Sequence, residues 1–245
     1  MLSEQDVIIP DWPAPSNVRA LQTTRHGGIS QSPYDSLNLG MHVNDIGVNV
    51  AANRQRLNQW VPTEPVWLNQ VHGIAVVDAS VASCVPDADA AYAETRHTVC
   101  AVMTADCLPV LVCDKAGTIV AAVHAGWRSL LDGVIETTVA AMARPGEELL
   151  AWLGPAIGPD AFEVGDEVRS AFMAHDARAE QAFRSSSAAG KWLGDIFMLG
   201  RQRLESVGVN AVYGGGICTY QDAERFFSFR RDDVTGRMAS LIWLE

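Results

Sequence analysis

The chain has 245 residues, 48% of them hydrophobic, and a formal net charge of −11 at pH 7. This length suits one large domain with a substantial buried core, so we predict a single domain over residues 1–245. The excess of acidic groups repels phosphate backbones and argues against nucleic acid as the main partner. A small phosphorylated ligand stays compatible, because a few local arginines suffice to bind one.

The sequence shows no segment that would direct the chain to a membrane or to export. The first residues show neither the basic nor the apolar part of a signal peptide. The longest apolar run, residues 101–113, is interrupted by Thr104, Asp106 and Pro109, which argues against a membrane span. The five cysteines are odd in number and form no C-x-x-C pair, as is typical of reduced thiols. We therefore predict a cytoplasmic protein with no membrane partner.

In the first half of the chain, strands are predicted over residues 7–9, 18–24, 66–71 and 74–78. A helix is predicted from a cap at Asn44 to about Trp60. Between them, residues 25–40 form a long Gly-rich stretch with little periodicity. Long irregular segments in compact domains are usually functional or disordered, and the apolar residues within this one indicate that it packs against the core.

Three apolar runs at residues 98–104, 108–113 and 118–123 form the centre of the chain and predict strands covered on both faces. A helix should follow Trp127, where Ser129 and Asp132 resemble a capping box. Later, strands are predicted at 149–153, 211–213, 226–229 and 239–244, and helices at 163–174 and 196–207. Strands and helices that do not alternate strictly indicate an α+β fold of mixed β-sheets with helices on the outside.

Two histidines and a cysteine stand at the ends of strand-like runs: His72, Cys107 and His124. Taken singly, such a histidine is more often a hydrogen-bonded polar residue, and such a cysteine a small core residue. If the three ends converge, they form a His-Cys-His set of zinc ligands with an open fourth position, as in catalytic zinc sites. The ligands span some fifty residues, so spacing alone leaves both interpretations open.

Four other polar residues are candidates for the same site. Asp106, next to Cys107, is either a base that acts in catalysis or a carboxylate that bonds the backbone of a turn. Arg128, just before the predicted helix, is either an anion ligand or part of a surface salt bridge. Arg25 and Asn38, in the Gly-rich stretch, are weaker candidates for substrate binding, and His42 is the most site-like of the remaining histidines.

Seven motifs, taken in order, closely resemble one bacterial protein family. They are TRHGGIS (24–30), SLNLG (36–40), NQVHG (69–73), TADCLPV (104–110), HAGWR (124–128), GPAIG (154–158) and FSFRRD (227–232). The family has been described as peptidoglycan editing factor, as multicopper polyphenol oxidase (laccase) and as purine nucleoside phosphorylase-like. The resemblance runs essentially from end to end. One departure is Ser129, where the family usually has glycine.

The resemblance implies one catalytic domain of α/β/β/α layers, similar to toxin-type cysteine hydrolases. It also implies a zinc site at His72, Cys107 and His124, with purine nucleosides and phosphate as substrates. The reactions would be phosphorolysis of adenosine, inosine and methylthioadenosine, and deamination of adenosine. Alternatives are an amidase that edits a peptidoglycan precursor at the same site, or Cys107 acting as a nucleophile without metal.

The polyphenol oxidase alternative implies several coppers, which makes it less favoured than one zinc. A multicopper site needs many histidines, and this chain has six in all. A single zinc with an open position suits deamination or amide hydrolysis directly, because zinc lowers the pKa of its water ligand to about 7. The sequence does not fix the oligomeric state.

Overall fold

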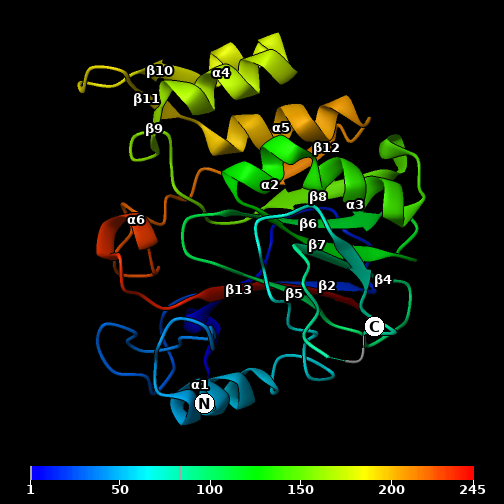
Figure 1. Cartoon of the computed structure of the whole chain (residues 1–245). Helices are drawn as coiled ribbons and strands as arrows, with labels where there is room; N and C mark the ends of the chain where they lie inside the picture. Colours follow the sequence, from blue (N-terminus) through cyan, green and yellow to red (C-terminus); the bar gives the residue numbers. More distant parts are fainter. Residues whose placement is uncertain (1, 83) are drawn as a thin grey trace.

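The computed structural model describes residues 2–82 and 84–245. Two β-sheets lie face to face at its centre (Figure 1). The larger has six strands in the order β12-β8-β6-β7-β4-β3. These strands are β3 (Val76–Asp78), β4 (Ala90–Ala93), β6 (Leu108–Asp114), β7 (Val120–Ala125), β8 (Leu149–Leu153) and β12 (Ala211–Gly214). The sheet is mixed, because β6 is antiparallel to β7 and β8 whereas β12 runs parallel to β8.

The second sheet has four strands in the order β1-β2-β13-β5, and its three internal pairings are antiparallel. Its strands are β1 (Val7–Ile8), β2 (Val18–Thr23), β5 (Cys100–Thr104) and β13 (Met238–Leu244). The C-terminal strand β13 lies between the early strand β2 and the central strand β5. This pairing joins both ends of the chain into one core.

Helices cover the outer faces of both sheets. The helix α1 (Gly47–Leu57) covers the four-stranded sheet, and α2 (Trp127–Asp132), α3 (Val134–Met142) and α5 (Ile196–Ser206) cover the six-stranded one (Figure 1). Beyond α5 lie α4 (Asp166–His175) and a small antiparallel sheet of β9 (Glu163–Gly165), β10 (Phe183–Ser185) and β11 (Lys191–Gly194). A short helix, α6 (Phe229–Asp232), stands at one side. The order of layers is therefore helix, sheet, sheet, helix, and the predicted α+β class is confirmed.

The central apolar runs form strands because both of their faces are covered. Every residue of β5, β6, β7 and β8 is buried. In β6, Leu111 packs between the two sheets, whereas Val110 and Val112 pack under the helices. A near-continuous apolar run is thus compatible here with a mostly antiparallel sheet, because helices cover the face that water would otherwise contact.

Two predicted strands do not form. Residues 66–71 make only isolated bridges, from Val66 to Cys100 and from Asn69 to Asp87, before a turn in which His72 has a φ of 59°. At residues 226–229, Phe226 and Phe227 are fully buried and pack with Met238, but they belong to a loop that leads into α6. Trp67, Leu68, Phe226 and Phe227 are buried, as their apolar character suggests, whereas Val71 and Phe229 are more than half exposed.

The predicted helix ends also need correction. Asn44 has a φ of 66° and does not cap α1, which begins after Ile46. Ser129 lies inside α2, where its hydroxyl donates to the carbonyls of His124 and Gly126, so it forms no capping box. Gly133, with a φ of 103°, separates α2 from α3.

Two smaller differences concern the remaining elements. The helix predicted at 163–174 loses its first residues to β9. The short strands β4, β10 and β11 were absent from the prediction, because each has at most four residues. None of the helices in residues 2–82 and 84–245 combines the length and hydrophobicity needed to span a bilayer.

Candidate metal centre

The three predicted ligands converge. One ligand atom from each of His72, Cys107 and His124 lies within 4.8 Å of the other two, and no other group of three His, Cys, Asp or Glu side chains does so in the described part of the chain. The Cys107 sulfur lies 3.7 Å from Nε2 of His72. The two imidazole rings meet edge to face at 4.8 Å between centroids.

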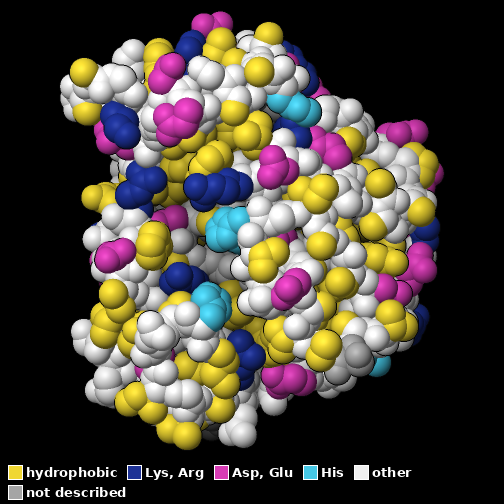
Figure 2. Space-filling view, in the orientation of Figure 1, with side chains coloured by type: hydrophobic (Ala, Val, Ile, Leu, Met, Phe, Trp, Pro, Cys, Tyr) yellow, Lys and Arg dark blue, Asp and Glu magenta, His cyan; other side chains and the backbone are white. Residues whose placement is uncertain are grey.

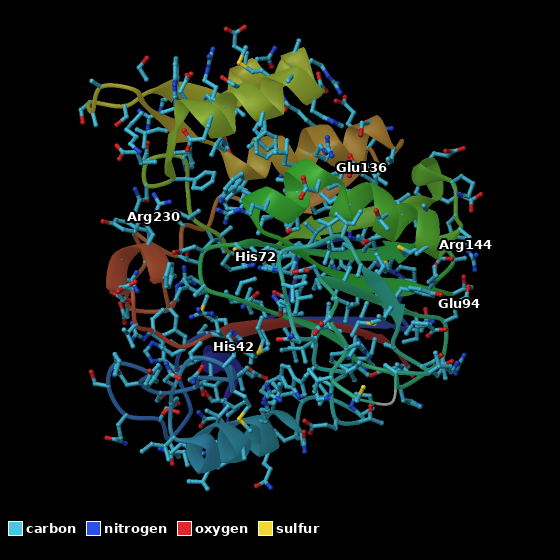
Figure 3. All side chains as sticks on the ribbon, viewed as in Figure 1. His42, His72, Glu94, Glu136, Arg144 and Arg230 are labelled. Atoms are coloured by element: carbon cyan, nitrogen blue, oxygen red, sulfur yellow. The ribbon has the colours of Figure 1, made fainter. Side chains whose placement is uncertain are left out.

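Each ligand comes from a different local structure. His72 belongs to a turn between the isolated bridges and β3, Cys107 follows a turn between β5 and β6, and His124 lies near the end of β7. His124 is buried, Cys107 is half-buried and His72 is exposed. One side of the set therefore faces solvent, and Figure 3 shows His72 there, with His42 and Arg230 in different directions from it.

Asp89, which the sequence analysis missed, holds two of the three ligands. Its fully buried carboxylate accepts hydrogen bonds from the backbone amides of Val71, His72 and Gly73, at 2.6 to 3.2 Å. Oδ1 of the same carboxylate lies 2.7 Å from Nδ1 of His124. This contact favours the tautomer that leaves Nε2 of His124 free for a metal, as carboxylates that bond to zinc-binding histidines do.

The electrostatics of the group favour a thiolate. Burial raises the pKa of the Cys107 thiol, but the charges and hydrogen bonds of His124 and His72 outweigh it and bring the pKa to about 6. Burial likewise lowers the pKa of His124, whereas Cys107 and Asp89 raise it to about 9. For Asp89, burial raises the pKa, and the hydrogen bonds from His124 and the 72–73 turn bring it below its usual value. Thiolate is the form in which cysteine binds metal.

The donor set fits zinc. Tetrahedral zinc, with bonds of about 2.0 to 2.3 Å to nitrogen and sulfur, places its ligand atoms roughly 3.5 Å apart. The 3.7 Å between Cys107 and His72 matches that spacing. Gly126 leaves room for the set, because a Cβ there would lie 2.7 Å from His72 and 3.2 Å from Cys107. Three such protein ligands leave the fourth position for another molecule.

Asp106 has a φ of 93° and reaches away from the ligand set into protein contacts. Its carboxylate accepts hydrogen bonds from the hydroxyls of Thr219 and Ser228, at 2.7 and 3.1 Å, and from the backbone amide of Arg230, at 2.7 Å. Its backbone carbonyl accepts from Ile157. These contacts fix the turn that presents Cys107.

The three predicted substrate-binding residues take different places. Arg128 lines a cavity together with His72, Cys107 and His124. Arg25 lines no cavity next to these ligands, because its guanidinium bonds the carbonyls of Asp35 and Ala223 and lies over Phe227. Asn38 is fully buried, and its carbonyl oxygen accepts from the amides of Gly40 and Arg237. Neither Arg25 nor Asn38 is placed for direct contact with a ligand in this cavity.

Basic side chains gather around the opening. Figure 2 shows two histidines at the centre of one face, with Lys or Arg and hydrophobic side chains beside them. His42 lies near enough to Arg237 and Arg54 that burial and these two charges lower its pKa. Arg237 was not among the sequence candidates. Arg237 lies in the C-terminal segment, far from the motifs that carry the candidate ligands, so nothing in the sequence singled it out.

The fold and this centre together define an α+β protein with a candidate His-Cys-His metal site. Residues 19–245 match the model of the family described as multi-copper polyphenol oxidoreductase laccase, and the chain belongs to that family. Similar curated proteins include "Purine nucleoside phosphorylase YfiH" of Escherichia coli and a purine nucleoside phosphorylase of Pseudomonas aeruginosa. Each is 56% identical, and the alignments cover 97% of this chain and 98% of either relative.

Solved structures agree with the fold. A Neisseria meningitidis protein superposes with a TM-score of 0.95 at 52% identity, covering 98% of this chain and 99% of its own. YlmD from Geobacillus stearothermophilus gives 0.88 at 30% identity, covering 95% and 94% of the two chains. These similarities confirm the resemblance that the motifs indicated.

Proposed function

We propose that this chain is a zinc-dependent enzyme that cleaves purine nucleosides by phosphorolysis, acting on adenosine, inosine and methylthioadenosine, and that also deaminates adenosine. The observation that carries the proposal is the convergence of His72, Cys107 and His124 in a cavity that Arg128 also lines. The names of relatives at 56% identity support it. Residues 1–245 act as one catalytic domain, with nucleoside and phosphate as partners.

The residues of the centre have separable roles in this proposal. His72, Cys107 and His124 hold the zinc, which supplies Lewis-acid charge at the end of the cavity when bound. Asp89 fixes the orientation of His124 and the 72–73 turn. Arg128 contributes positive charge toward an anionic substrate. Asp106, predicted as a catalytic residue, takes a positioning role because its carboxylate is occupied by three protein donors.

The copper oxidase alternative has less support. A multicopper enzyme needs more than one cluster of metal ligands, and residues 2–82 and 84–245 contain a single group of three such side chains. Zinc also suits a set of two imidazoles and one thiolate with an open position. Copper at this one centre is the less favoured alternative, and the metal content of the purified protein distinguishes it from zinc.

One arrangement favours a second candidate function. In space, His124 lies between Cys107 and Asp89. This is the arrangement of nucleophile, base and orienting carboxylate in cysteine hydrolases. This arrangement would suit hydrolysis without metal, with Cys107 as the nucleophile, and it corresponds to the predicted similarity to toxin-type hydrolases. The predicted amidase acting on a peptidoglycan precursor would instead use the same centre with zinc bound. That similarity and the cytoplasmic location stay predictions.

Metal analysis and a nucleoside screen on one purified sample test the proposal. We expect about one zinc per chain, lost in Cys107→Ala and His124→Ala. We expect free base from inosine only with phosphate, and inosine from adenosine without phosphate. Zinc-free wild-type protein, or a nucleoside screen without any product, would refute the proposal. Release of an amino acid from a mis-acylated nucleotide-muramyl precursor would instead support the amidase, and the same release by the metal-free protein would support Cys107 as the nucleophile.

A further inference from the structure

Two cavities meet at the metal ligands. The larger, of about 370 Å³, and the smaller, of about 240 Å³, share His72, Cys107, Ala105 and Phe229 in their walls. Their other residues differ. In Figure 3, His42 of the larger cavity and Arg230 of the smaller one lie in different directions from His72. A ligand that occupies both cavities therefore passes the His72–Cys107 pair.

The larger cavity is basic. Arg128, Arg237 and His42 line it, and no Asp or Glu belongs to its described wall. Within residues 2–82 and 84–245, neither arginine has a carboxylate at salt-bridge distance. The guanidinium of Arg128 lies over the Trp127 ring, and that of Arg237 bonds only the carbonyls of Thr235 and Gly236. In a chain with a net charge of −11, two such arginines create a local field that attracts an anion.

A buried hydroxyl in the same wall lacks a partner. Thr104 is 1% exposed, and its Oγ1 makes no hydrogen bond with any described residue. Buried hydroxyls rarely go unpaired, because the loss of water contacts is then uncompensated. Thr104 is one of the residues that line the basic cavity, so its unpaired hydroxyl is a candidate donor to a ligand oxygen that reaches it. This observation points to an oxygen-bearing ligand independently of the arginines.

The smaller cavity is apolar and aromatic. Trp127, Phe162 and Phe229 line it with Ile157 and Ile196. Its arginine, Arg230, donates to the backbone carbonyl of Glu163 at 2.8 Å. Asp106, also in this wall, has its carboxylate occupied by protein donors. Flat aromatic and aliphatic side chains of this kind bind the faces of a heterocyclic base.

We propose that the basic cavity is the phosphate subsite and the aromatic cavity is the purine subsite, with the ribose between them beside His72 and Cys107. This assignment rests on the proposed function. A phosphate oxygen forms a bond to C1′ while the bond from C1′ to the purine nitrogen breaks. The electron pair leaves with the purine, which takes up the proton that hydrogen phosphate gives up, and ribose 1-phosphate forms. Separate cavities place nucleophile and leaving group apart, as displacement at one carbon requires.

Steady-state kinetics of the zinc-loaded enzyme separate the two subsites. Arg237→Gln and Arg128→Gln should each raise the KM for phosphate about tenfold or more, because each removes a charge-assisted contact. The KM for inosine should change less than about twofold. Trp127→Leu should show the reverse pattern. Arg237→Lys should restore part of the phosphate affinity, and Arg178→Gln, at an exposed ion pair outside both cavities, is the matched control.

Calorimetric titration with inorganic phosphate, without nucleoside, tests the anion site directly. Wild-type protein should bind phosphate, and Thr104→Val should weaken binding about tenfold, since the variant keeps the shape and removes only the hydroxyl. Arg237→Gln should weaken it at least as much. Thermal unfolding of each variant shows whether a loss comes from the site or from misfolding, and Arg237→Lys gives a second reading if Arg237→Gln does not fold.

The outcomes separate this inference from the proposed function. If nucleosides are cleaved with phosphate but both arginine variants keep the wild-type KM for phosphate, the subsite assignment is overturned and phosphorolysis stands. If phosphate binds and the binding is lost in Arg237→Gln while no nucleoside is cleaved, the anion site stands and the proposed function fails. Absence of phosphate binding in the zinc-loaded wild type overturns the assignment.

Discussion

At the scale of single residues, Asp89 connects two ligands that are 52 residues apart in the sequence. Replacing it with asparagine keeps the shape but loses one acceptor oxygen and the charge that orients His124. We expect Asp89→Asn to weaken zinc binding about 10- to 100-fold, as is typical when a carboxylate bonded to a metal-binding histidine is replaced. Competition with a chromogenic chelator measures the affinity.

Asp87→Asn is the matched control for this prediction. Asp87 bonds the amide of Asn69 and does not contact the ligands. Zinc affinity should stay at the wild-type value in Asp87→Asn. If both aspartate variants lose affinity equally, the effect comes from net charge and the assigned role of Asp89 is wrong.

Gly126 makes a second prediction at this scale. A methyl group there would overlap His72 at 2.7 Å and press on Cys107 at 3.2 Å, whereas a methyl group on Gly47, at the start of α1, meets nothing within 4 Å. Gly126→Ala should therefore displace His72 and reduce the zinc content measured by atomic absorption. Gly47→Ala should keep it. Full zinc content in Gly126→Ala would contradict this prediction and show that the His72 turn can move without loss of zinc binding.

At the scale of elements, the sequence predicted the central strands well, and the short edge strands and the turns poorly. The runs that became β5, β6, β7 and β8 are apolar throughout, and burial on two faces enforces that pattern. No local sequence pattern predicts the positive φ angles of His72 and Asp106. Hydrogen bonds to Asp89 and to residues around α6, in other parts of the chain, hold these two turns. The three candidate ligands could be named from their motifs, and the fold brings them together, while Asp89 and Arg237 became evident only through the fold.

The turn between β5 and β6 gives the prediction for this scale. Asp106→Ala removes the acceptor of two hydroxyls and one amide and places alanine at a φ of 93°. We expect a loss of about 1 to 3 kcal/mol in the free energy of unfolding, measured with urea. Asp106→Asn should lose less, because asparagine tolerates left-handed backbone and keeps one oxygen.

The same pair of variants separates positioning from catalysis. If Asp106 only positions the turn, Asp106→Asn should keep a substantial part of kcat, and any loss of kcat should follow the loss of stability. If Asp106→Asn folds with wild-type stability and loses nearly all of its activity, Asp106 acts as a base on substrate, and the structural role that we assign to it is insufficient.

At the scale of the whole molecule, zinc would join two loop positions and one strand position in a single centre. His72 precedes β3, Cys107 comes directly before β6 and His124 lies in β7, so a shared ion would link three segments that separate on unfolding. Free zinc at about 100 times its Kd should stabilise the fold by about 2.7 kcal/mol. For a domain of this size that corresponds to a rise in Tm of roughly 5 to 10 °C.

Differential scanning calorimetry with and without a chelator measures this shift. His124→Ala should show almost none, because two remaining ligands bind zinc weakly, and magnesium should not replace zinc, since it prefers oxygen ligands. An equal shift in His124→Ala would place the stabilising zinc elsewhere on this acidic surface. A zinc ion bound here would thus stabilise the fold as well as supply chemistry, because its candidate ligands lie on separate elements that only the folded chain brings together.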